Sequence, residues 1–95
     1  MSYMRLVRFT LSHAGRSQAQ PMADDLVAAI KEQPGCADAT FFGGGADGEC
    51  GLCVHWDSQE HADAAAAIIS PRLMQHLAGN IVGQADIRLF PVMAN

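Results

Sequence analysis

The sequence predicts an α+β fold in which a four-stranded antiparallel sheet carries two helices on one face. Three observations lead to this prediction. Four short segments alternate apolar and polar residues or stay apolar throughout, as strands do, and two longer segments repeat apolar residues at helical spacing. The six segments follow the order β-α-β-β-α-β, which is the split β-α-β pattern of ferredoxin-like folds. At 95 residues, the chain is expected to form a single domain over residues 1–95.

The strands are expected over residues 4–12, 36–43, 49–56 and 86–92. The first alternates regularly, with Val7, Phe9 and Leu11 on one face. Pro91 has no backbone N–H to donate to a neighbouring strand, so the last strand is expected to end at a sheet edge. Glycines dominate the connection at residues 43–48. Because no helix with Lys and Ser or Thr follows them, a hairpin turn is favoured over a phosphate-binding loop.

The two helices are bounded by recognisable start and stop residues. The first is expected to begin at Pro21 and to end at Pro34-Gly35. The second begins after Asp57-Ser58, either of which can cap it. Pro71 is expected to interrupt this helix and to start a short separate one. The short helix would turn three residues inward, Leu73, Met74 and Leu77.

The composition limits the partners of the chain. The six Lys and Arg residues are scattered and the net charge is −4, so no basic surface for nucleic acid is expected. No apolar run approaches the roughly 18 residues of a membrane span, and the N-terminus lacks an export signal, so we expect a cytoplasmic protein away from membranes. Three cysteines leave one over in any intramolecular pairing, which favours reduced thiols.

A second copy of the chain is the macromolecular partner that the sequence favours. Hydrophobic residues make up 49% of the sequence and charged residues only 17%, which is lean in charge for a small domain. The strands at 36–43 and 49–56 carry apolar or small residues on both faces, whereas a sheet with one face in water should alternate. We therefore expect a homodimer that packs sheet against sheet.

The stretch Cys50-x-x-Cys53 followed by His55 invites a redox or metal interpretation. Within a strand, however, residues three apart point to opposite faces of the sheet, so the two thiols cannot share a metal or a disulfide. A zinc site would need a second pair of ligands, and a thioredoxin-like site would need a helix directly after the motif. We therefore expect two packing residues and no metal site.

Trp56 ends its strand directly before a helix cap and shares a face with Leu52 and Val54. It can be a core residue, because an indole buries a large area. It can equally be the wall of a pocket, where its Nε1–H would donate a hydrogen bond to a ligand. His55 is expected on the opposite face, at the dimer interface.

Two segments, "PGCADATFF" and "LCVHWDSQEHADAAAAIISPRLMQHL", resemble the antibiotic biosynthesis monooxygenase family. The resemblance is carried by a helix-ending Pro-Gly-Cys, a strand-ending Trp followed by Ser and Glu, and a Ser-Pro before the last helical segment, and it covers nearly the whole chain. It implies a ferredoxin-like protomer that pairs into a dimeric α+β barrel. Known activities of the family include cofactor-free oxygenation of anthrones and quinols, haem degradation, isomerisation and signal-molecule processing, so the family alone does not fix a reaction.

The chain departs from the haem-degrading members of that family. Those members use an Asn on the first strand, a Trp inside the helix after the third strand and a His on the short helix. Here the first strand offers Arg8, Thr10 and Ser12 but no Asn, and alanines fill the place of the Trp. Only His76 matches, so the resemblance argues against haem degradation. Arg72 stands where many members carry a His.

Cofactor-free oxygenation needs few protein groups. A deprotonated phenol or anthrone can itself reduce O₂, so the protein supplies an apolar pocket, a base or hydrogen-bond partner, and exclusion of water. The predicted catalytic residues are Trp56, as wall and donor, and His76, as base or orienting group. His76 can also be a solvated residue in the last turn of a helix, where a cation is favoured. The predicted substrate-binding residues are Arg8, Thr10 and Arg72.

Two functional hypotheses follow. The first is a homodimeric, cofactor-independent monooxygenase-like enzyme that acts on a small aromatic or quinone-type metabolite. The second is a non-catalytic ligand-binding or stress-associated protein with the same dimeric barrel. The number of polar groups that converge on the pocket separates the two hypotheses.

Overall fold

The computed structural model describes residues 1–44 and 47–95, and its elements follow the predicted order. The middle of the glycine-rich connection, residues 45 and 46, lies outside the described residues, so the predicted hairpin turn there is not described. The elements are β1 (Tyr3–Leu11), a 3-10 turn η1 (Ala14–Gln18), α1 (Ala19–Lys31), β2 (Cys36–Gly43), β3 (Glu49–Trp56), α2 (Gln59–Leu77) and β4 (Ile81–Pro91).

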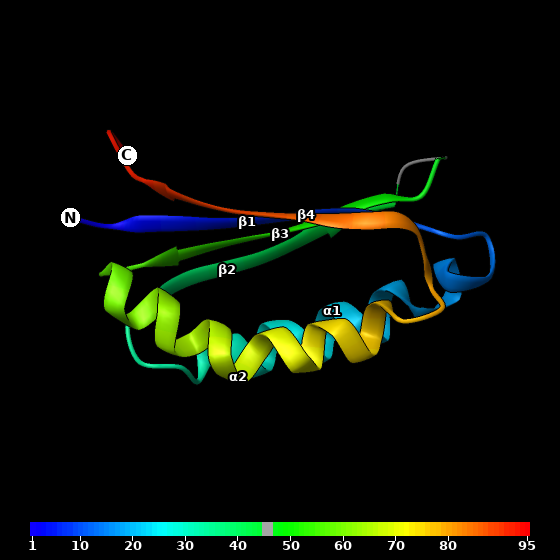
Figure 1. Ribbon diagram of the computed structural model, residues 1–95, viewed down its shortest axis with the longest axis horizontal. Coiled ribbons are helices and arrows are strands. Elements are labelled where there is room, and N and C mark those ends of the chain that lie inside the picture. Colours follow the sequence, from blue (N-terminus) through cyan, green and yellow to red (C-terminus); the bar gives the residue numbers. More distant parts are fainter. Residues whose placement is uncertain (45–46) are drawn as a thin grey trace.

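The strands form one antiparallel sheet in the order β2-β3-β1-β4, and both helices lie on one face of it (Figure 1). Each helix connects two strands that have a third strand between them, because α1 leads from β1 to β2 around β3, and α2 leads from β3 to β4 around β1. This is the ferredoxin-like arrangement that the sequence predicts. Among the described residues, no helix is both long and apolar enough to cross a membrane.

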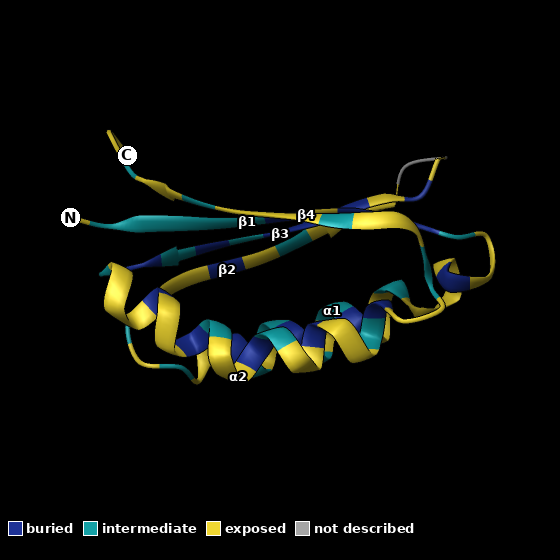
Figure 2. Ribbon diagram, viewed as in Figure 1, coloured by how far each residue is buried: buried dark blue, intermediate teal, exposed yellow. Residues whose placement is uncertain are grey.

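The core lies between the sheet and the helices. Leu52, Val54 and Trp56 of β3 are each at most 3% exposed and face the helices, whereas β4 is exposed along most of its length (Figure 2). Cys50 is buried beside Phe9 on the same face, while Cys53 lies beside Leu6 on the other and is only partly buried. The prediction that the two thiols point to opposite faces is confirmed.

We call the side of the sheet away from the helices the outer face. Strand register places on it Met4, Leu6, Arg8, Thr10, Phe42, Cys53, His55, Val82 and Phe90. His55 therefore lies opposite Trp56, as predicted. Phe42 and Phe90 are 41% and 39% exposed, so this face presents aromatic side chains to its surroundings.

Helix α2 corrects one prediction. The expected break at Ser70-Pro71 is wrong, because α2 runs without interruption for 19 residues through Pro71. Its buried side chains recur at helical spacing on both sides of the proline, and this packing outweighs the single backbone hydrogen bond that proline cannot donate. The carbonyl that loses its partner belongs to Ala67, an exposed residue that water can reach. The buried side chains of α2 are Ala62, Ala65, Ile69, Leu73 and Leu77.

Met74, predicted to point inward, is instead 46% exposed. In a continuous helix it falls outside the stripe that contains Leu73 and Leu77, both of which are buried as predicted. The first helix also begins earlier than expected, at Ala19, so that Pro21 lies within the first turn, where a missing N–H removes no helical hydrogen bond.

Strand β4 begins at Ile81, five residues before the predicted start. Its pairing with β1 shifts register between Arg8 and Thr10, and Gly83 has a positive φ of 71°. This irregularity interrupts the alternation by which a strand is recognised in a sequence. Pro91 ends β4, which is an edge strand as predicted.

Candidate functional site

A cavity of about 60 Å³ lies between the sheet and α2. Its wall is apolar except for three side chains, Arg5 of β1, Trp56 of β3 and Ser70 of α2. Ile30 of α1 and Ile87 of β4 also line it. A mostly apolar wall with a few polar groups is the usual lining of a ligand site.

Trp56 is held in this wall by the chain on either side of it. The strand ends at Trp56, and the next residue, Asp57, donates its backbone N–H to the carbonyl of Gly35 at 2.9 Å. Ser58 then caps α2, since its Oγ accepts from the N–H of His61 at 3.2 Å. Gly35 has a φ of 84°, a left-handed conformation that other residues adopt only with strain, so glycine is favoured at this turn.

The indole N–H of Trp56 is the unusual polar group of the site. Trp56 is 3% exposed, and its buried Nε1 has no hydrogen-bond partner among the described residues. Leaving a buried donor unpaired costs about 1–3 kcal/mol, and native proteins rarely do so without a reason. Trp56 is buried in the core and also lines the cavity.

Arg5 is the site residue that the motifs did not single out. It pairs in register with Val54 and Leu89, so it lies on the helix-facing side of the sheet. Its side chain is 21% exposed, and the nearest carboxylate, that of Asp63 on α2, lies 3.8 Å from its Nη2. A signal for Arg5 exists in the sequence, because the alternation that buries Val7 places Arg5 on the same face.

The predicted substrate-binding residues Arg8 and Thr10 lie on the outer face, separated from Trp56 by the sheet. Arg8 Nη2 donates to Oε1 of Glu49 at 2.5 Å, and this hydrogen bond raises the pKa of the guanidinium. Both residues border a shallow depression that also includes Val82 and Asp86.

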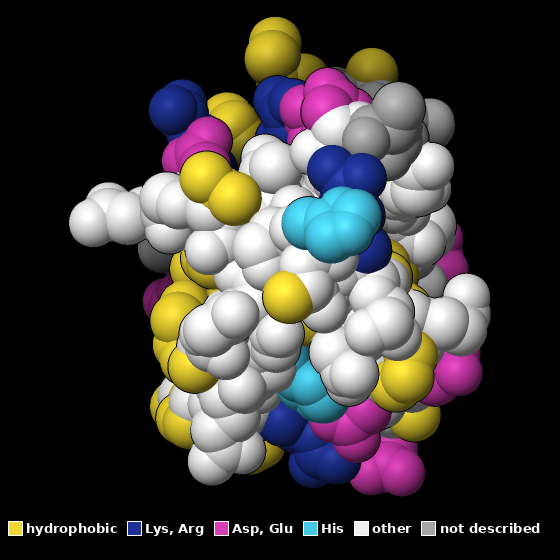
Figure 3. Space-filling view, turned by 90° about the vertical axis from the view of Figure 1, so that its right-hand side faces the viewer, with side chains coloured by type: hydrophobic (Ala, Val, Ile, Leu, Met, Phe, Trp, Pro, Cys, Tyr) yellow, Lys and Arg dark blue, Asp and Glu magenta, His cyan; other side chains and the backbone are white. Residues whose placement is uncertain are grey.

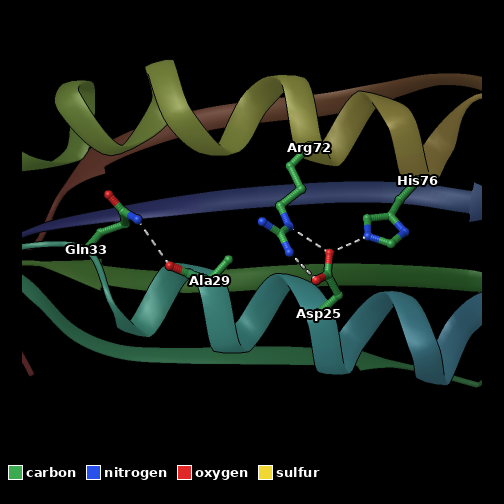
Figure 4. Close-up of polar contacts among 5 residues, drawn as sticks. All are labelled: Asp25, Ala29, Gln33, Arg72 and His76. Carbon is green, nitrogen blue, oxygen red and sulfur yellow. Dashed lines mark hydrogen bonds and ion pairs between the residues drawn. The ribbon is translucent and has the colours of Figure 1, made fainter.

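Arg72 and His76 lie one turn apart on α2 and both contact Asp25 of α1 (Figure 4). Arg72 Nε donates to Oδ2 of Asp25 at 2.8 Å, and Nε2 of His76 lies 2.6 Å from the same oxygen. The hydrogen bonds from Arg72 and then His76 hold the pKa of Asp25 well below its usual range. Neither residue lines the Trp56 cavity.

The five predicted site residues thus fall into three places. Arg72 and His76 are brought together on Asp25, Arg8 and Thr10 share the outer face, and Trp56 lines the cavity with Arg5. Within the part of the chain that the structure describes, no three His, Cys, Asp or Glu side chains are grouped closely enough to hold a metal ion. On the face drawn in Figure 3, described Lys and Arg side chains alternate with acidic and apolar ones instead of forming a continuous basic surface.

Neither a protein-family model nor a curated protein sequence matches the chain. Solved structures do match it over nearly the full length of both chains. Rv0793 from Mycobacterium tuberculosis is similar at 14% identity and a TM-score of 0.83, covering 100% of this chain and 98% of its own. A structure described as an antibiotic biosynthesis monooxygenase is similar at 15% identity and a TM-score of 0.81, covering 97% and 99%.

A third similar structure is SnoaB from Streptomyces nogalater, described as a cofactor-independent oxygenase. It is 17% identical, with a TM-score of 0.76, and the match covers 99% of this chain and 95% of SnoaB. The TM-scores establish a likeness of fold, and at these low identities the likeness extends to the fold alone. The chain therefore has the fold of the antibiotic biosynthesis monooxygenases, as its sequence motifs indicate.

Proposed function

We propose that the chain is a cofactor-independent monooxygenase-like enzyme that takes a small aromatic or quinone-type molecule into the Trp56 cavity. The observation that carries this proposal is the buried, unpaired Nε1–H of Trp56 in the wall of an apolar cavity. A ligand oxygen accepting from that donor would remove the penalty of leaving it unpaired. The fold shared with SnoaB, a cofactor-independent oxygenase, adds support.

The reaction would use the substrate as its own reductant. A deprotonated anthrone or quinol gives electrons to O₂, one oxygen atom becomes the new carbonyl oxygen on the ring, and the other leaves as water. The apolar wall would exclude bulk water, and a donor such as Trp56 would hold the ring oxygen on which negative charge develops.

The size of the cavity sets a condition on this proposal. Pockets that hold small molecules commonly enclose about 300–1,000 Å³, so a cavity of about 60 Å³ is too small for an aromatic substrate as it stands. A substrate must therefore move side chains at the cavity wall. Ile87 is suited to this, because it lies on edge strand β4 and is 40% exposed.

We propose that Trp56 alone among the five predicted residues contacts the substrate directly. For Arg72 and His76 we propose a positioning role, since their contacts with Asp25 fix α2 against α1, and α2 supplies one wall of the cavity. Arg8 and Thr10 would act at the outer face.

The outer face is the surface on which we propose that a second copy packs. Phe42, Val82 and Phe90 are exposed there, and Phe42 covers Gly51, where a Cβ would lie 2.2 Å from the ring. Such a face buries apolar surface when two sheets stack. We also propose a cytoplasmic location, with the three free thiols Cys36, Cys50 and Cys53 as its support.

One observation favours the second candidate function, a non-catalytic ligand-binding or stress-associated protein. Among the described residues, Arg5 is the only ionisable side chain in the cavity wall, so no described carboxylate or imidazole there can accept a substrate proton. A binding protein does not need such a base.

Oxygen uptake separates the two functions. The intact protein is mixed with 1,4-dihydroxynaphthalene or anthrone in an oxygen electrode, and the uptake rate is compared with that of heat-denatured protein. The proposal expects faster uptake and a product with one added oxygen atom, which is anthraquinone from anthrone and 2-hydroxy-1,4-naphthoquinone from 1,4-dihydroxynaphthalene. Ligand-induced thermal stabilisation with no uptake above the uncatalysed rate, for several such substrates, would instead establish the binding function.

A further inference from the structure

Arg5 has more hydrogen-bond donors than the protein uses. The guanidinium carries five N–H groups, and among the described residues its side chain makes no hydrogen bond, only the 3.8 Å approach to Asp63. By contrast, Arg8, Arg72 and Arg88 each donate directly to a carboxylate. Arg5 is also less exposed than these three, at 21% against 52%, 51% and 64%. Arg5 is therefore the least exposed of these four guanidinium groups and also the one that makes no hydrogen bond to the described residues.

Trp56 provides an independent observation in the same wall. Its buried Nε1–H also lacks an acceptor within the described chain. Arg5 and Trp56 come from neighbouring strands, since β1 pairs with β3, and both line the same cavity. The polar part of the wall is thus dominated by donors, with the hydroxyl of Ser70 as the side chain there that can also accept.

The charges around Arg5 leave room for an anion. Asp63, the nearest carboxylate, is 62% exposed and stands at the limit of ion-pair distance, so its attraction is screened by water. The register neighbours of Arg5 are Val54 and Leu89, which are uncharged. An oxyanion inside the cavity would therefore lie near the positive charge of Arg5, and no described residue of the cavity wall carries a negative charge.

We infer that the cavity selects aromatic molecules that carry an oxyanion, a phenolate, enolate or carboxylate, and binds the charged oxygen through Arg5 and Trp56. The ligand oxygen replaces Asp63 as the main counter-ion of Arg5, and the ring extends along the apolar wall. Because the described residues of the wall include no base, the ligand enters already deprotonated. The pH dependence of binding then follows the pKa of the ligand.

This inference rests on the proposed function only in taking the Trp56 cavity as the substrate site. Trp56 is the single tryptophan of the chain, so its fluorescence reports directly on this cavity. Isothermal calorimetry on the intact protein gives the affinities, and Trp56 fluorescence shows whether the ligand reaches the cavity.

The probes are matched in size and differ in charge. Benzoate is the carboxylate, benzyl alcohol the neutral analogue and benzylamine the cation, while 4-cyanophenol is measured above and below its own pKa to test the phenolate. We expect at least one anion to bind about tenfold or more tightly than benzyl alcohol, as a charge-assisted hydrogen bond predicts. Benzoate and 4-cyanophenolate together show which oxyanion the site accepts. Equal affinities for anion, neutral molecule and cation would overturn the inference.

Two substitutions move the affinity in opposite directions. Arg5→Gln is expected to abolish the preference for the anion, and Arg5→Lys, which keeps the charge but loses the planar fork, to retain part of it. Asp63→Asn removes the competing carboxylate from an exposed position and is expected to raise anion affinity about two- to fivefold. Arg16→Gln, the same change at an exposed arginine on η1, is the matched control and should leave the preference intact. If Arg5→Gln misfolds, weaker or unchanged anion binding by Asp63→Asn still contradicts the inference.

The failure of this inference is distinguishable from failure of the proposed function. Oxygen uptake that is unaffected by Arg5→Gln leaves the oxygenase proposal standing and removes the oxyanion site. Anion-selective binding without oxygen uptake leaves the oxyanion site standing and identifies the chain as a binding protein.

Discussion

Nε2 of His76 lies 2.6 Å from Oδ2 of Asp25, although the two residues are 51 positions apart in the chain. Together with Arg72, this contact joins the C-terminal half of α2 to the middle of α1 on the side of the helices that does not line the cavity (Figure 4). The contact makes the packing of the two helices sensitive to pH.

Asp25→Asn should therefore destabilise the protein in a pH-dependent way. The hydrogen bonds from Arg72 and His76 lower the pKa of Asp25 in the folded protein from its ordinary value of 3.8. A carboxyl with a lowered folded pKa contributes stability above its unfolded pKa and loses it as the pH falls through the folded value. The melting temperature of Asp25→Asn should lie below that of the parent at pH 7, and the gap should begin to narrow below about pH 4 and shrink further as the pH falls.

Asp24→Asn is the control for this prediction. Asp24 is exposed and is contacted by Gln20 of the same helix, not by α2. Its melting curve should follow that of the parent across the pH range. A gap for Asp25→Asn that stays constant from pH 7 to pH 2 would contradict the proposed linkage.

Pro71→Ala should stabilise the protein, since α2 is continuous through this position. Alanine restores the N–H that can donate to the carbonyl of Ala67, and proline in a helix interior costs about 3 kcal/mol relative to alanine. Pro71 is exposed, so little packing is lost. We expect the free energy of unfolding in urea to rise by about 1–3 kcal/mol.

Pro21→Ala tests whether that gain comes from the helix interior. Pro21 lies in the first turn of α1, where no intrahelical hydrogen bond is missing. Its replacement should change the free energy of unfolding by less than about 0.5 kcal/mol. Equal changes in the free energy of unfolding for Pro71→Ala and Pro21→Ala would refute the explanation that Pro71 costs α2 an interior hydrogen bond.

Trp56→Phe should lower oxygen uptake while leaving the fold intact. The change keeps an aromatic ring and removes the Nε1–H, which makes no hydrogen bond to the described chain. Stability should fall only by the lost packing, about 1–2 kcal/mol. The rate should fall about tenfold or more, because a hydrogen bond to a developing negative charge is worth about 1.5–3 kcal/mol.

Phe9→Leu controls for that loss of packing. Phe9 is 4% exposed and faces the helices but does not line the cavity. It should lower stability to a similar extent and leave uptake per folded molecule unchanged. Equal uptake by Trp56→Phe and the parent protein would show that the indole N–H has no role.

The dimer is tested at the outer face. Light scattering on the parent protein at micromolar concentration should give twice the 10.1 kDa of one chain. Phe42→Glu combined with Phe90→Glu should give a monomer, because two buried charges would oppose each other across the sheets. Ile68→Glu, at a 59% exposed position on α2, should remain dimeric. A monomeric parent protein would rule out the sheet-to-sheet dimer.

Local signals account for what the sequence predicts correctly. β2 and β3 have the predicted bounds because Pro34-Gly35 and the glycines after residue 43 mark their ends sharply. The sequence pattern did not predict the first residues of β4, because the shift in register near Gly83 breaks their alternation of apolar and polar residues. The continuity of α2 depends on packing, which local propensity at Pro71 does not report.

In the candidate site, too, some residues could be placed from local signals and others depend on packing between elements. Trp56 and Arg5 lie on strands, where alternation fixes the face of a side chain, so both could be placed on the helix-facing side from the sequence. The pairing of Arg72 and His76 with Asp25 depends on how α1 and α2 pack against each other, and residues 47 and 51 positions apart give no local signal of it.

The two thiols of β3 are natural probes of opposite sides of the sheet. Cys53 is partly buried on the outer face, and burial raises its pKa, so alkylation there should be slow but measurable at alkaline pH. Stacking a second sheet on that face would shield Cys53 further, whereas Cys50, which is 2% exposed, reacts only when the helices part from the sheet. The two alkylation rates would therefore report separately how often the subunits of the proposed dimer separate and how often the core opens.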